Sequence, residues 1–316
     1  MAKNKPFISV IVPSRNEEKN IADCIDSLLN LDYPKKKYEI IISDGRSTDK
    51  TREIVKKYGK KIKLIDNSGI NSAAGRNIGI EEAKGEIIAF TDADCMVKKD
   101  WLKKLVSELK PNTVVGGPNI PPEDAPYFAK AIGYALSTFF GSAGSAQGYL
   151  FKEKTEVKSL ANANAMYWKK DLKKVGGYDE DFTTGQDAEI NYRLGKEGIR
   201  FYFIPDAVVL HKMRATPFKF AKRMFQYGYA RAKFMHRHRT PLNPIYAFMP
   251  AFALFTLFSP ALVYFIPAFS LLWMFYFLTA FLFALTTLKI GYLPAIMLAY
   301  FIEHLFYGLG FLYGLE

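Results

Sequence analysis

The C-terminal segment of this chain is so apolar that we expect it to lie in a lipid bilayer rather than in water. Between residues 245 and 316 the only charged residues and histidines are Lys289, Glu303, His304 and Glu316. The segment is interrupted at Pro267 and at residues 289–291, and each uninterrupted piece is close to the roughly 20 residues that a helix needs to cross a bilayer. The sequence therefore predicts membrane-spanning helices near residues 245–265, 268–288 and 292–314.

The charge of the chain is concentrated beside these predicted spans. The net charge is +12, yet no Asp or Glu occurs from residue 207 to residue 302, and nine Lys or Arg residues fall between Lys212 and Arg239. A basic segment next to membrane spans is attracted to the anionic cytoplasmic leaflet. We therefore predict a multi-pass protein of the cell membrane with a cytoplasmic N-terminal domain and no nucleic-acid partner. The polar N-terminus predicts no signal peptide, and Cys24 and Cys95 give neither a disulfide framework nor a zinc spacing.

The first 100 residues alternate between short apolar runs and segments with helical periodicity. The expected strands are residues 7–12, 38–42, 62–65 and 86–90, and the expected helices are residues 17–31, 47–58 and 72–83, the second capped by Ser47 or Thr48. Such alternation with short connections predicts βαβ units and an α/β fold with a mostly parallel sheet. Ligands of such sheets bind beyond the carboxyl ends of the strands, where the polar clusters at residues 13–17, 43–49 and 92–94 fall.

Beyond residue 101 the pattern is looser. Residues 127–140 are apolar and aromatic but too short to cross a bilayer, so they form either a core helix or a helix at the membrane surface. We expect a strand and a helix within residues 161–173, a helix at 185–198, a strand at 207–210 and a basic, aromatic helix at 217–239. The predicted domains are residues 1–215, a basic interfacial helix at 216–240, and a transmembrane domain at 241–316.

Asp92 and Asp94 form an Asp-x-Asp pair at the end of an expected strand. Two carboxylates so close together repel one another unless a cation lies between them, and Mg²⁺ or Mn²⁺ held together with a diphosphate would supply that cation. Read alone, the pair is also compatible with an ordinary loop and with the capping of a helix.

Four further polar residues lie near the expected strand ends or at a helix start, with Arg76 inside the helix expected at residues 72–83. Asp44 precedes Gly45, which permits a tight turn, and its carboxylate could accept a hydrogen bond from a base or a ribose. Arg76 could reach diphosphate oxygens, although a lone arginine is more often solvated. Asp187 opens a helix, where the helix dipole favours an acidic residue and where it could also act as a general base. His211 follows a strand and is either structural or a metal ligand.

Taken together, these clusters resemble glycosyltransferase family 2, which has the GT-A fold. The matching stretches are VIVPSRNEEKNI (10–21), SDGRSTDKT (43–51), NSAAGRNIGI (71–80), FTDADC (90–95), GGYDEDFTTGQDAEINYRLGKEG (176–198) and PDAVVLH (205–211). Their order and spacing agree over about residues 7–240. Within the family, the chain is similar to membrane-bound members of the succinoglycan-synthesis type, whose basic helix before the spans resembles FQYGYARAK (225–233).

The resemblance implies an inverting, metal-dependent enzyme that moves a sugar from a UDP- or GDP-sugar to a hydroxyl of a lipid-linked acceptor. It also implies roles for individual residues. The donor would be bound by Pro13, Arg15, Glu17, Asp44, Arg76 and Asp92. Mg²⁺ or Mn²⁺ would be held by Asp92, Asp94 and His211, and Asp187 would be the catalytic base. The acceptor or the membrane interface would be contacted by Arg214, Gln226 and Arg231.

Two departures from the family pattern make the base of the donor harder to predict. The family often has two aspartates where this chain has Ser43 and Asp44, and Glu-Asp where this chain has Gln186 and Asp187. The alternative enzyme is a polyprenyl-phosphate glycosyltransferase, which needs no general base because its phosphate acceptor is already anionic. The alternative outside enzymes is a catalytically silent membrane scaffold that binds a nucleotide, although Asp94 and Asp187 are both retained.

Overall fold

The computed structural model describes residues 5–146, 148, 150–213, 216–241 and 244–316, which form two compact units. The first unit is drawn from Met1–Ile120, Ser145–Gln147 and Phe151–His211, and the second from Pro121–Gly144, Gly148–Leu150 and Lys212–Glu316. Residues 121–144, which the sequence prediction included in the first domain, therefore pack with the C-terminal helices. The predicted functional boundaries near residues 215 and 240 stay a prediction.

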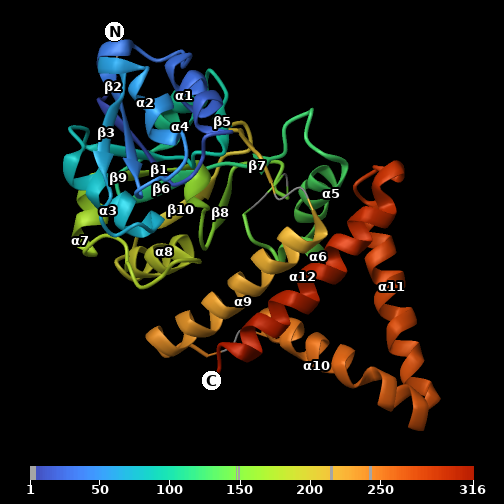
Figure 1. Cartoon of the computed structure of the whole chain (residues 1–316). Coiled ribbons are helices and arrows are strands. Elements are labelled where there is room, and N and C mark those ends of the chain that lie inside the picture. The colour runs from blue at the N-terminus through green and yellow to red at the C-terminus, as the bar shows by residue number, and fades with distance from the viewer. Residues whose placement is uncertain (1–4, 147, 149, 214–215, 242–243) are drawn as a thin grey trace. The chain divides into compact units, whose positions relative to one another are not determined.

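An eight-stranded sheet forms the centre of the first unit (Figure 1). Its order is β3 (Lys63–Asp66), β2 (Tyr38–Asp44), β1 (Ile8–Ser14), β4 (Ile87–Phe90), β9 (Ala165–Trp168), β6 (Thr113–Gly116), β10 (Arg200–Phe203) and β8 (Thr155–Val157). Strands β1 to β4 are parallel, and β6 and β10 run in the same direction, whereas β9 and β8 run against their neighbours. The predicted α/β fold with a mostly parallel sheet is confirmed.

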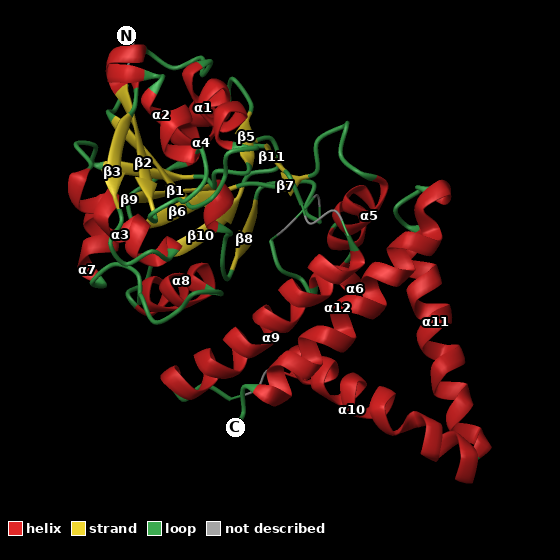
Figure 2. Ribbon diagram, viewed as in Figure 1, coloured by secondary structure: helices red, strands yellow, loops and turns green. Residues whose placement is uncertain are grey.

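Helices cover both faces of this sheet (Figure 2). One face carries α1 (Ile21–Leu29), α2 (Thr51–Lys56) and α4 (Trp101–Glu108), and the other carries α3 (Ser72–Glu82), α7 (Lys169–Lys174) and α8 (Gln186–Lys196). Each face of the sheet has its own hydrophobic core, because successive side chains of β1 point to opposite faces. Val10 and Val12 pack with α1 and α4, whereas Ile11 packs with α3.

The expected elements of the first 90 residues are present, with one difference at the end of a strand and one at the start of a helix. β1 continues through Pro13, which is tolerated because β4 pairs with β1 only as far as Ile11. The predicted capping of α2 by Ser47 or Thr48 is wrong, because the helix begins at Thr51 and has no side-chain cap. The Ser47 hydroxyl is instead held by Asp44.

A second, three-stranded sheet in the same unit has the order β5 (Cys95–Val97), β11 (Val209–His211) and β7 (Asn119–Ile120). β11 is antiparallel to β5 and parallel to β7. In this register Cys95 is the direct partner of His211. The small sheet therefore brings the histidine beside the end of the Asp-x-Asp segment.

The second unit is helical and contains three helices that are long and apolar enough to cross a membrane, at Tyr246–Phe265, Pro267–Leu285 and Ile290–Tyr313. They correspond to α10 (Pro244–Phe265), α11 (Ser270–Leu285) and α12 (Leu293–Tyr313), which confirms the three predicted apolar helices. Most large side chains of α10 and α11 are exposed, as expected of surfaces that face lipid.

The basic helix α9 (Pro217–His238) lies alongside α12 within this unit (Figure 1). Glycines allow the two backbones to approach closely, because a Cβ at Gly228 would lie 1.9 Å from the carbonyl oxygen of Tyr307, and a Cβ at Gly310 would lie 2.0 Å from that of Phe225. Residues 127–140 form α5 (Tyr127–Leu136) and the start of α6 (Phe139–Ser142), which pack against α12. They belong to the core of the helical unit, and their second interpretation, as a helix at the membrane surface, stays a prediction.

Candidate active site

The loops that follow β1 and β2 are joined by hydrogen bonds at the carboxyl end of the sheet. The backbone N–H of Thr48 donates to Asn16 Oδ1 at 2.8 Å, and the backbone N–H of Glu17 donates to Thr51 Oγ1 at 2.7 Å. These bonds leave Arg15 exposed and Glu17 half-buried at the edge where ligands of such sheets bind. The predicted donor contacts of Arg15 and Glu17 stay predictions, but their placement is consistent with them.

Asp44 ends β2, where it pairs with Ser14 of β1 directly after buried Pro13, and it is 1% exposed. Its Oδ1 accepts from the Ser47 hydroxyl at 2.6 Å, and its Oδ2 accepts from Arg52 Nη1 at 2.8 Å. Arg52 also pairs with Asp66 Oδ1 at 2.6 Å, and the two carboxylates raise the pKa of its guanidinium. The sequence analysis missed Arg52, because its link to Asp44 depends on how α2 turns back towards β2. A carboxylate accepts about four hydrogen bonds, so Asp44 retains capacity for a donor group.

The helix α3 packs closely against the sheet because two residues of the Gly-Arg-Asn-x-Gly motif are glycines and have no Cβ. A Cβ at Gly79 would lie 2.5 Å from Ile11 Cγ2, and one at Gly75 would lie 2.8 Å from Ser43 Oγ. This close approach buries Arg76, which is only 5% exposed. The interpretation of Arg76 as a solvated arginine is therefore wrong.

Arg76 connects the end of β4 to the start of α8. Its Nη2 donates to Asp92 Oδ1 at 2.7 Å, and its Nη1 donates to Gln186 Oε1 at 2.7 Å. The guanidinium carbon lies 5.9 Å from the ring centroid of Phe90 and 5.7 Å from that of Tyr178, which confines it sterically. Arg76 thus fixes the Asp92 carboxylate, and its direct contact with a donor stays a prediction.

Asp187 lies in the first turn of α8. This helix begins directly after Gly185, whose φ of 75° lies in the left-handed region that glycine favours. The side chain is half-buried, Oδ1 accepts from the N–H of Ala188 at 3.0 Å, and no ion pair of Asp187 occurs in the described residues. Burial raises the pKa of the Asp187 carboxyl and nearby Asp92 adds to the rise, whereas Arg76 opposes it. A raised pKa makes a carboxylate a stronger proton acceptor.

Asp94 and His211 approach each other at one end of the small sheet, where β5 begins and β11 ends. His211 Nε2 lies 3.4 Å from Asp94 Oδ2, and in the described residues Cys95 completes a cluster whose ligand atoms all lie within 4.8 Å of one another. A carboxylate and an imidazole fit a divalent cation such as Mn²⁺. Asp92 is outside this cluster and is bonded to Arg76 instead, so its assignment as a metal ligand stays a prediction.

The sequence analysis missed Cys95 as a neighbour of the candidate metal ligands. Burial raises the pKa of its thiol well above the usual value, and Asp94 and Asp92 add to the rise. A protonated thiol is a poor ligand for Mg²⁺ or Mn²⁺. Its position opposite His211 depends on the pairing of β5 with β11, which spacing along the chain does not reveal.

The remaining predicted contacts belong to the second unit. Arg231 donates from Nε to the Tyr307 hydroxyl at 3.3 Å, and its guanidinium carbon lies 4.3 Å from the ring centroid of Tyr246. It therefore ties α9 to α12 and α10. Gln226 is half-buried on α9, and Arg214 lies outside the described residues. Their proposed contact with an acceptor or with the membrane interface stays a prediction.

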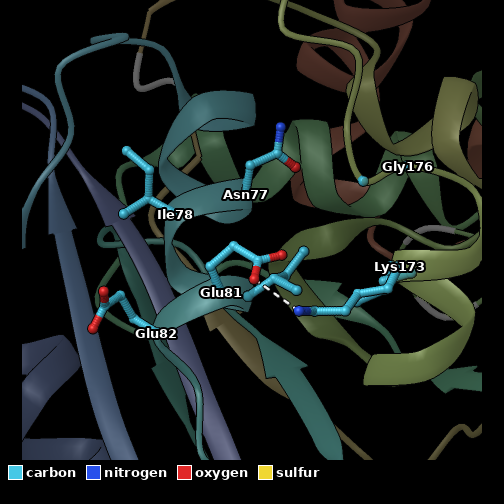
Figure 3. A pocket seen from close by; sticks show the side chains of 9 residues that line it. Asn77, Ile78, Glu81, Glu82, Lys173 and Gly176 are labelled. Carbon is cyan, nitrogen blue, oxygen red and sulfur yellow. Dashed lines mark hydrogen bonds and ion pairs between the residues drawn. The ribbon is translucent and has the colours of Figure 1, made fainter.

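A pocket between α3 and the end of α7 lies outside this group of residues (Figure 3). Asn77, Glu81, Lys173 and Gly176 are among the residues that line it, and Lys173 Nζ pairs with Glu81 Oε2 at 2.7 Å. None of the candidate donor, metal or base residues lines this pocket, so it does not correspond to the predicted active site.

Comparisons with known proteins identify the fold and the family. The family model described as glycosyl transferase family 2 matches residues 9–176. The chain is 31% identical over 274 residues, covering 82% of this chain and 84% of the relative, to the Methanococcus voltae dolichyl N-acetyl-alpha-D-glucosaminyl phosphate 3-beta-D-2,3-diacetamido-2,3-dideoxy-beta-D-glucuronosyltransferase. It is 28% identical over 242 residues, covering 73% of this chain and 70% of the relative, to the Rhizobium meliloti succinoglycan biosynthesis protein ExoA.

A solved structure supports the same fold over nearly the whole chain. The mannosyltransferase PcManGT from Pyrobaculum calidifontis, in complex with GDP-Man and Mn²⁺, aligns with a TM-score of 0.67 at 19% identity, and covers 93% of this chain and 86% of that chain. The predicted resemblance, including that to the succinoglycan-synthesis type, is confirmed by these matches. The chain, with its GT-A sheet, its retained carboxylates and its relatives of nearly full length, belongs to glycosyltransferase family 2 and is a glycosyltransferase.

Proposed function

We propose that this enzyme inverts the anomeric centre as it moves a sugar from a UDP- or GDP-sugar to a hydroxyl of a lipid-linked saccharide, at the cytoplasmic face of the cell membrane. The observation that carries the proposal is the bonded series Asp92–Arg76–Gln186, which brings the start of α8, and with it Asp187, to the Asp-x-Asp end of β4. A general base and a diphosphate site at one edge of a sheet are what such a transfer requires.

Asp187 is the proposed general base. Inversion requires the acceptor oxygen to attack the anomeric carbon from the side opposite the diphosphate. A hydroxyl is a weak nucleophile, so a carboxylate within hydrogen-bond reach takes its proton as the new bond forms. The half-buried position of Asp187 and the rise of its pKa by burial both support this role.

Asp94 and His211 are the proposed ligands of Mn²⁺ or Mg²⁺, with Asp92 as a further carboxylate on the donor side. When bound, the cation would neutralise negative charge that develops on the departing diphosphate. His211 favours Mn²⁺ over Mg²⁺ in this site, because imidazole suits manganese whereas magnesium prefers oxygen ligands. The Asp94 to His211 distance of 3.4 Å supports a shared ligand role.

The nucleotide of the donor would lie against the joined loops after β1 and β2. Pro13, Arg15, Glu17 and Asp44 line the carboxyl ends of these strands, and Asp44 retains acceptor capacity for a base or ribose group. Arg76 would contribute by holding Asp92 in place beneath the diphosphate.

The acceptor is proposed from the relatives and from the helical unit. The name of the Methanococcus voltae relative specifies a sugar phosphate carried by dolichol, and the Rhizobium meliloti relative takes part in succinoglycan biosynthesis. Three apolar helices and the basic helix α9 support a reaction at a membrane. The basic residues before the spans favour the cytoplasmic side for the sheet unit, with Gln226 and Arg231 towards the interface.

The alternative is an acceptor that is itself a polyprenyl phosphate. Such an acceptor is already ionised, so the reaction would not depend on Asp187. A catalytically silent scaffold is not favoured, because Asp94 and Asp187 are both retained. Asp94 belongs to the Asp-x-Asp segment after β4, and Asp187 lies near Asp92 of the same segment.

The deciding experiment is transfer by the Asp187→Asn variant, measured separately with a lipid-linked saccharide and with a polyprenyl phosphate as acceptor. We expect turnover on the saccharide to fall by about 10²–10⁴-fold, the usual effect of losing a general base, while donor binding with Mn²⁺ is kept. The matched control is Asp181→Asn, an exposed aspartate of the same segment, which should keep its activity. Nearly unchanged turnover in Asp187→Asn, with polyprenyl phosphate as the better acceptor, would establish the alternative.

A further inference from the structure

A thiol lies beside the two candidate metal ligands, and the proposed transfer reaction makes no use of it. Asp94, Cys95 and His211 each offer one ligand atom, and these atoms all lie within 4.8 Å of one another. His211 Nε2 is 3.4 Å from Asp94 Oδ2, and Cys95 Sγ is 3.8 Å from Asp94 Oδ1. Together they form a mixed set of oxygen, sulfur and nitrogen ligands.

The register of the small sheet fixes two of the three ligands on one face. β5 and β11 are antiparallel neighbours, and Cys95 is the direct partner of His211. Directly opposed residues in such a pair have Cβ atoms about 4.5–5.5 Å apart and project to the same side. Asp94 immediately precedes β5 and is nearly buried. Because Cys95 and His211 lie on paired strands and Asp94 directly precedes one of them, the cluster needs little rearrangement to bind an ion.

The separations suit a small tetrahedral cation that bonds to sulfur. Zinc binds Cys sulfur at about 2.3 Å and His nitrogen or carboxylate oxygen at about 2.0–2.2 Å, so its neighbouring ligand atoms lie about 3.4–3.6 Å apart. The His211–Asp94 and Cys95–Asp94 distances are close to this range, although they end on different oxygens of Asp94. At a given site of nitrogen, oxygen and sulfur ligands, zinc binds more tightly than manganese.

We propose that Asp94, Cys95 and His211 form a site for a thiophilic divalent cation of the zinc class, which competes with the Mn²⁺ or Mg²⁺ used in transfer. Cys95 distinguishes the two classes of cation, because Asp94 and His211 serve either. The S–H proton of Cys95 passes to water as sulfur bonds to the cation. Binding stands independently of the transfer reaction, whereas inhibition by the bound cation rests on the proposed function.

The test titrates the full chain in detergent, after removal of metal with a chelator, with Cd²⁺ as the probe. Cadmium bound to a thiolate gives an ultraviolet sulfur-to-metal charge-transfer band. We expect the band to saturate at one Cd²⁺ per chain, to be displaced by Zn²⁺ and to resist an equal concentration of Mg²⁺. Cys95→Ser should remove the band, and Cys24→Ser, which alters the other buried cysteine, should keep it.

Calorimetry gives the second readout. Loss of even an outer partner of a metal ligand typically costs 10–100-fold in affinity, so Cys95→Ser should weaken Zn²⁺ binding by at least about tenfold and Mn²⁺ binding far less. Cys95→Ala is the second variant if Cys95→Ser unfolds at the temperature of the titration. The proposal is overturned if the wild-type chain gives no band, or if both Cys95 variants retain the band and the Zn²⁺ affinity.

Transfer assays separate this proposal from the proposed function. With Mn²⁺ fixed, the Zn²⁺ concentration that halves the activity of each protein should be at least about tenfold higher for Cys95→Ser than for wild type. A chain that shows the band but transfers no sugar keeps the cation site and loses the proposed function. A chain that transfers sugar with neither a band nor inhibition by Zn²⁺ keeps the proposed function and loses the cation site.

Discussion

Replacing Arg76 tests whether the bonded series Asp92–Arg76–Gln186 holds the active site together. In Arg76→Gln, Asp92 Oδ1 loses its cationic partner, and Gln186 Oε1 keeps only its bond from the Ser72 hydroxyl at 2.9 Å among the contacts described. Breaking a buried ion pair by removing one partner costs about 3–5 kcal/mol. The Asp92 side chain is 34% exposed, so water recovers part of this loss, and we expect a cost of about 2–3 kcal/mol.

The assay is thermal unfolding of the full chain in detergent, with transfer activity measured in parallel. For a domain of about 150–250 residues, each kcal/mol moves the midpoint by about 2–4 °C, so Arg76→Gln should melt about 4–12 °C lower. The matched control is Arg200→Gln, an exposed arginine 3.9 Å from Glu156, whose loss should cost at most about 0.5 kcal/mol. Arg76→Lys should lie between them, because one ammonium group cannot bond both partners as the planar guanidinium does.

Equal melting of Arg76→Gln and Arg200→Gln would refute this reasoning, because the buried network would then contribute no stability. A double-mutant cycle with Asp92→Asn adds a direct measure of the pair. Independent effects of the two substitutions would show that Arg76 does not act through Asp92.

Four further outcomes follow from the same geometry. First, because a base works only when deprotonated and the pKa of Asp187 is raised, kcat/KM should fall with decreasing pH at a higher pH than the usual aspartate pKa, and the pH profile of Asp187→Asn should lack this limb. Second, Asp94→Asn or a chelator should abolish transfer, and full activity in EDTA would contradict the metal role. Third, Gly79→Ala should destabilise the chain by about 1–3 kcal/mol because its Cβ would meet Ile11. By contrast, Gly195→Ala on α8, whose Cβ would make only an ordinary contact of 3.8 Å with Phe201, should be neutral or stabilising by about 0.5–1 kcal/mol in the same melting assay. Fourth, three spans with a cytoplasmic sheet unit place the C-terminus outside, so protease should remove a C-terminal tag from right-side-out vesicles, and protection would contradict that topology.

The features that the sequence predicted well are those encoded locally. Apolar runs of strand length, helical periodicity and stretches long enough to cross a bilayer each depend on neighbouring residues, so the sheet strands and the three apolar helices were found nearly in place. The position of the polar clusters followed from one topological rule, because parallel strands end at a common edge.

The features that the sequence did not predict depend on packing between distant segments. Arg76 is buried because Gly75 and Gly79 let α3 approach the sheet, and a motif alone does not reveal that approach. Cys95 meets His211 because two strands more than 100 residues apart pair in one register. Ser47 does not cap α2, because the helix begins only at Thr51 and the Ser47 hydroxyl donates a hydrogen bond to the Asp44 carboxylate instead.

The two carboxylates of the Asp-x-Asp segment have different neighbours, although the motif alone suggests that both contact one cation. Asp92 is directed to the side of the large sheet that α3 covers and is already neutralised by Arg76. Asp94, two residues later, lies at the start of the small sheet and faces His211, which is charged only when protonated. Asp94 therefore lies beside an imidazole that can share a cation with it, whereas Asp92 would meet a donor as a carboxylate whose charge is partly balanced by Arg76. This division makes Asp94 the stronger candidate for the metal and Asp92 the stronger candidate for the donor.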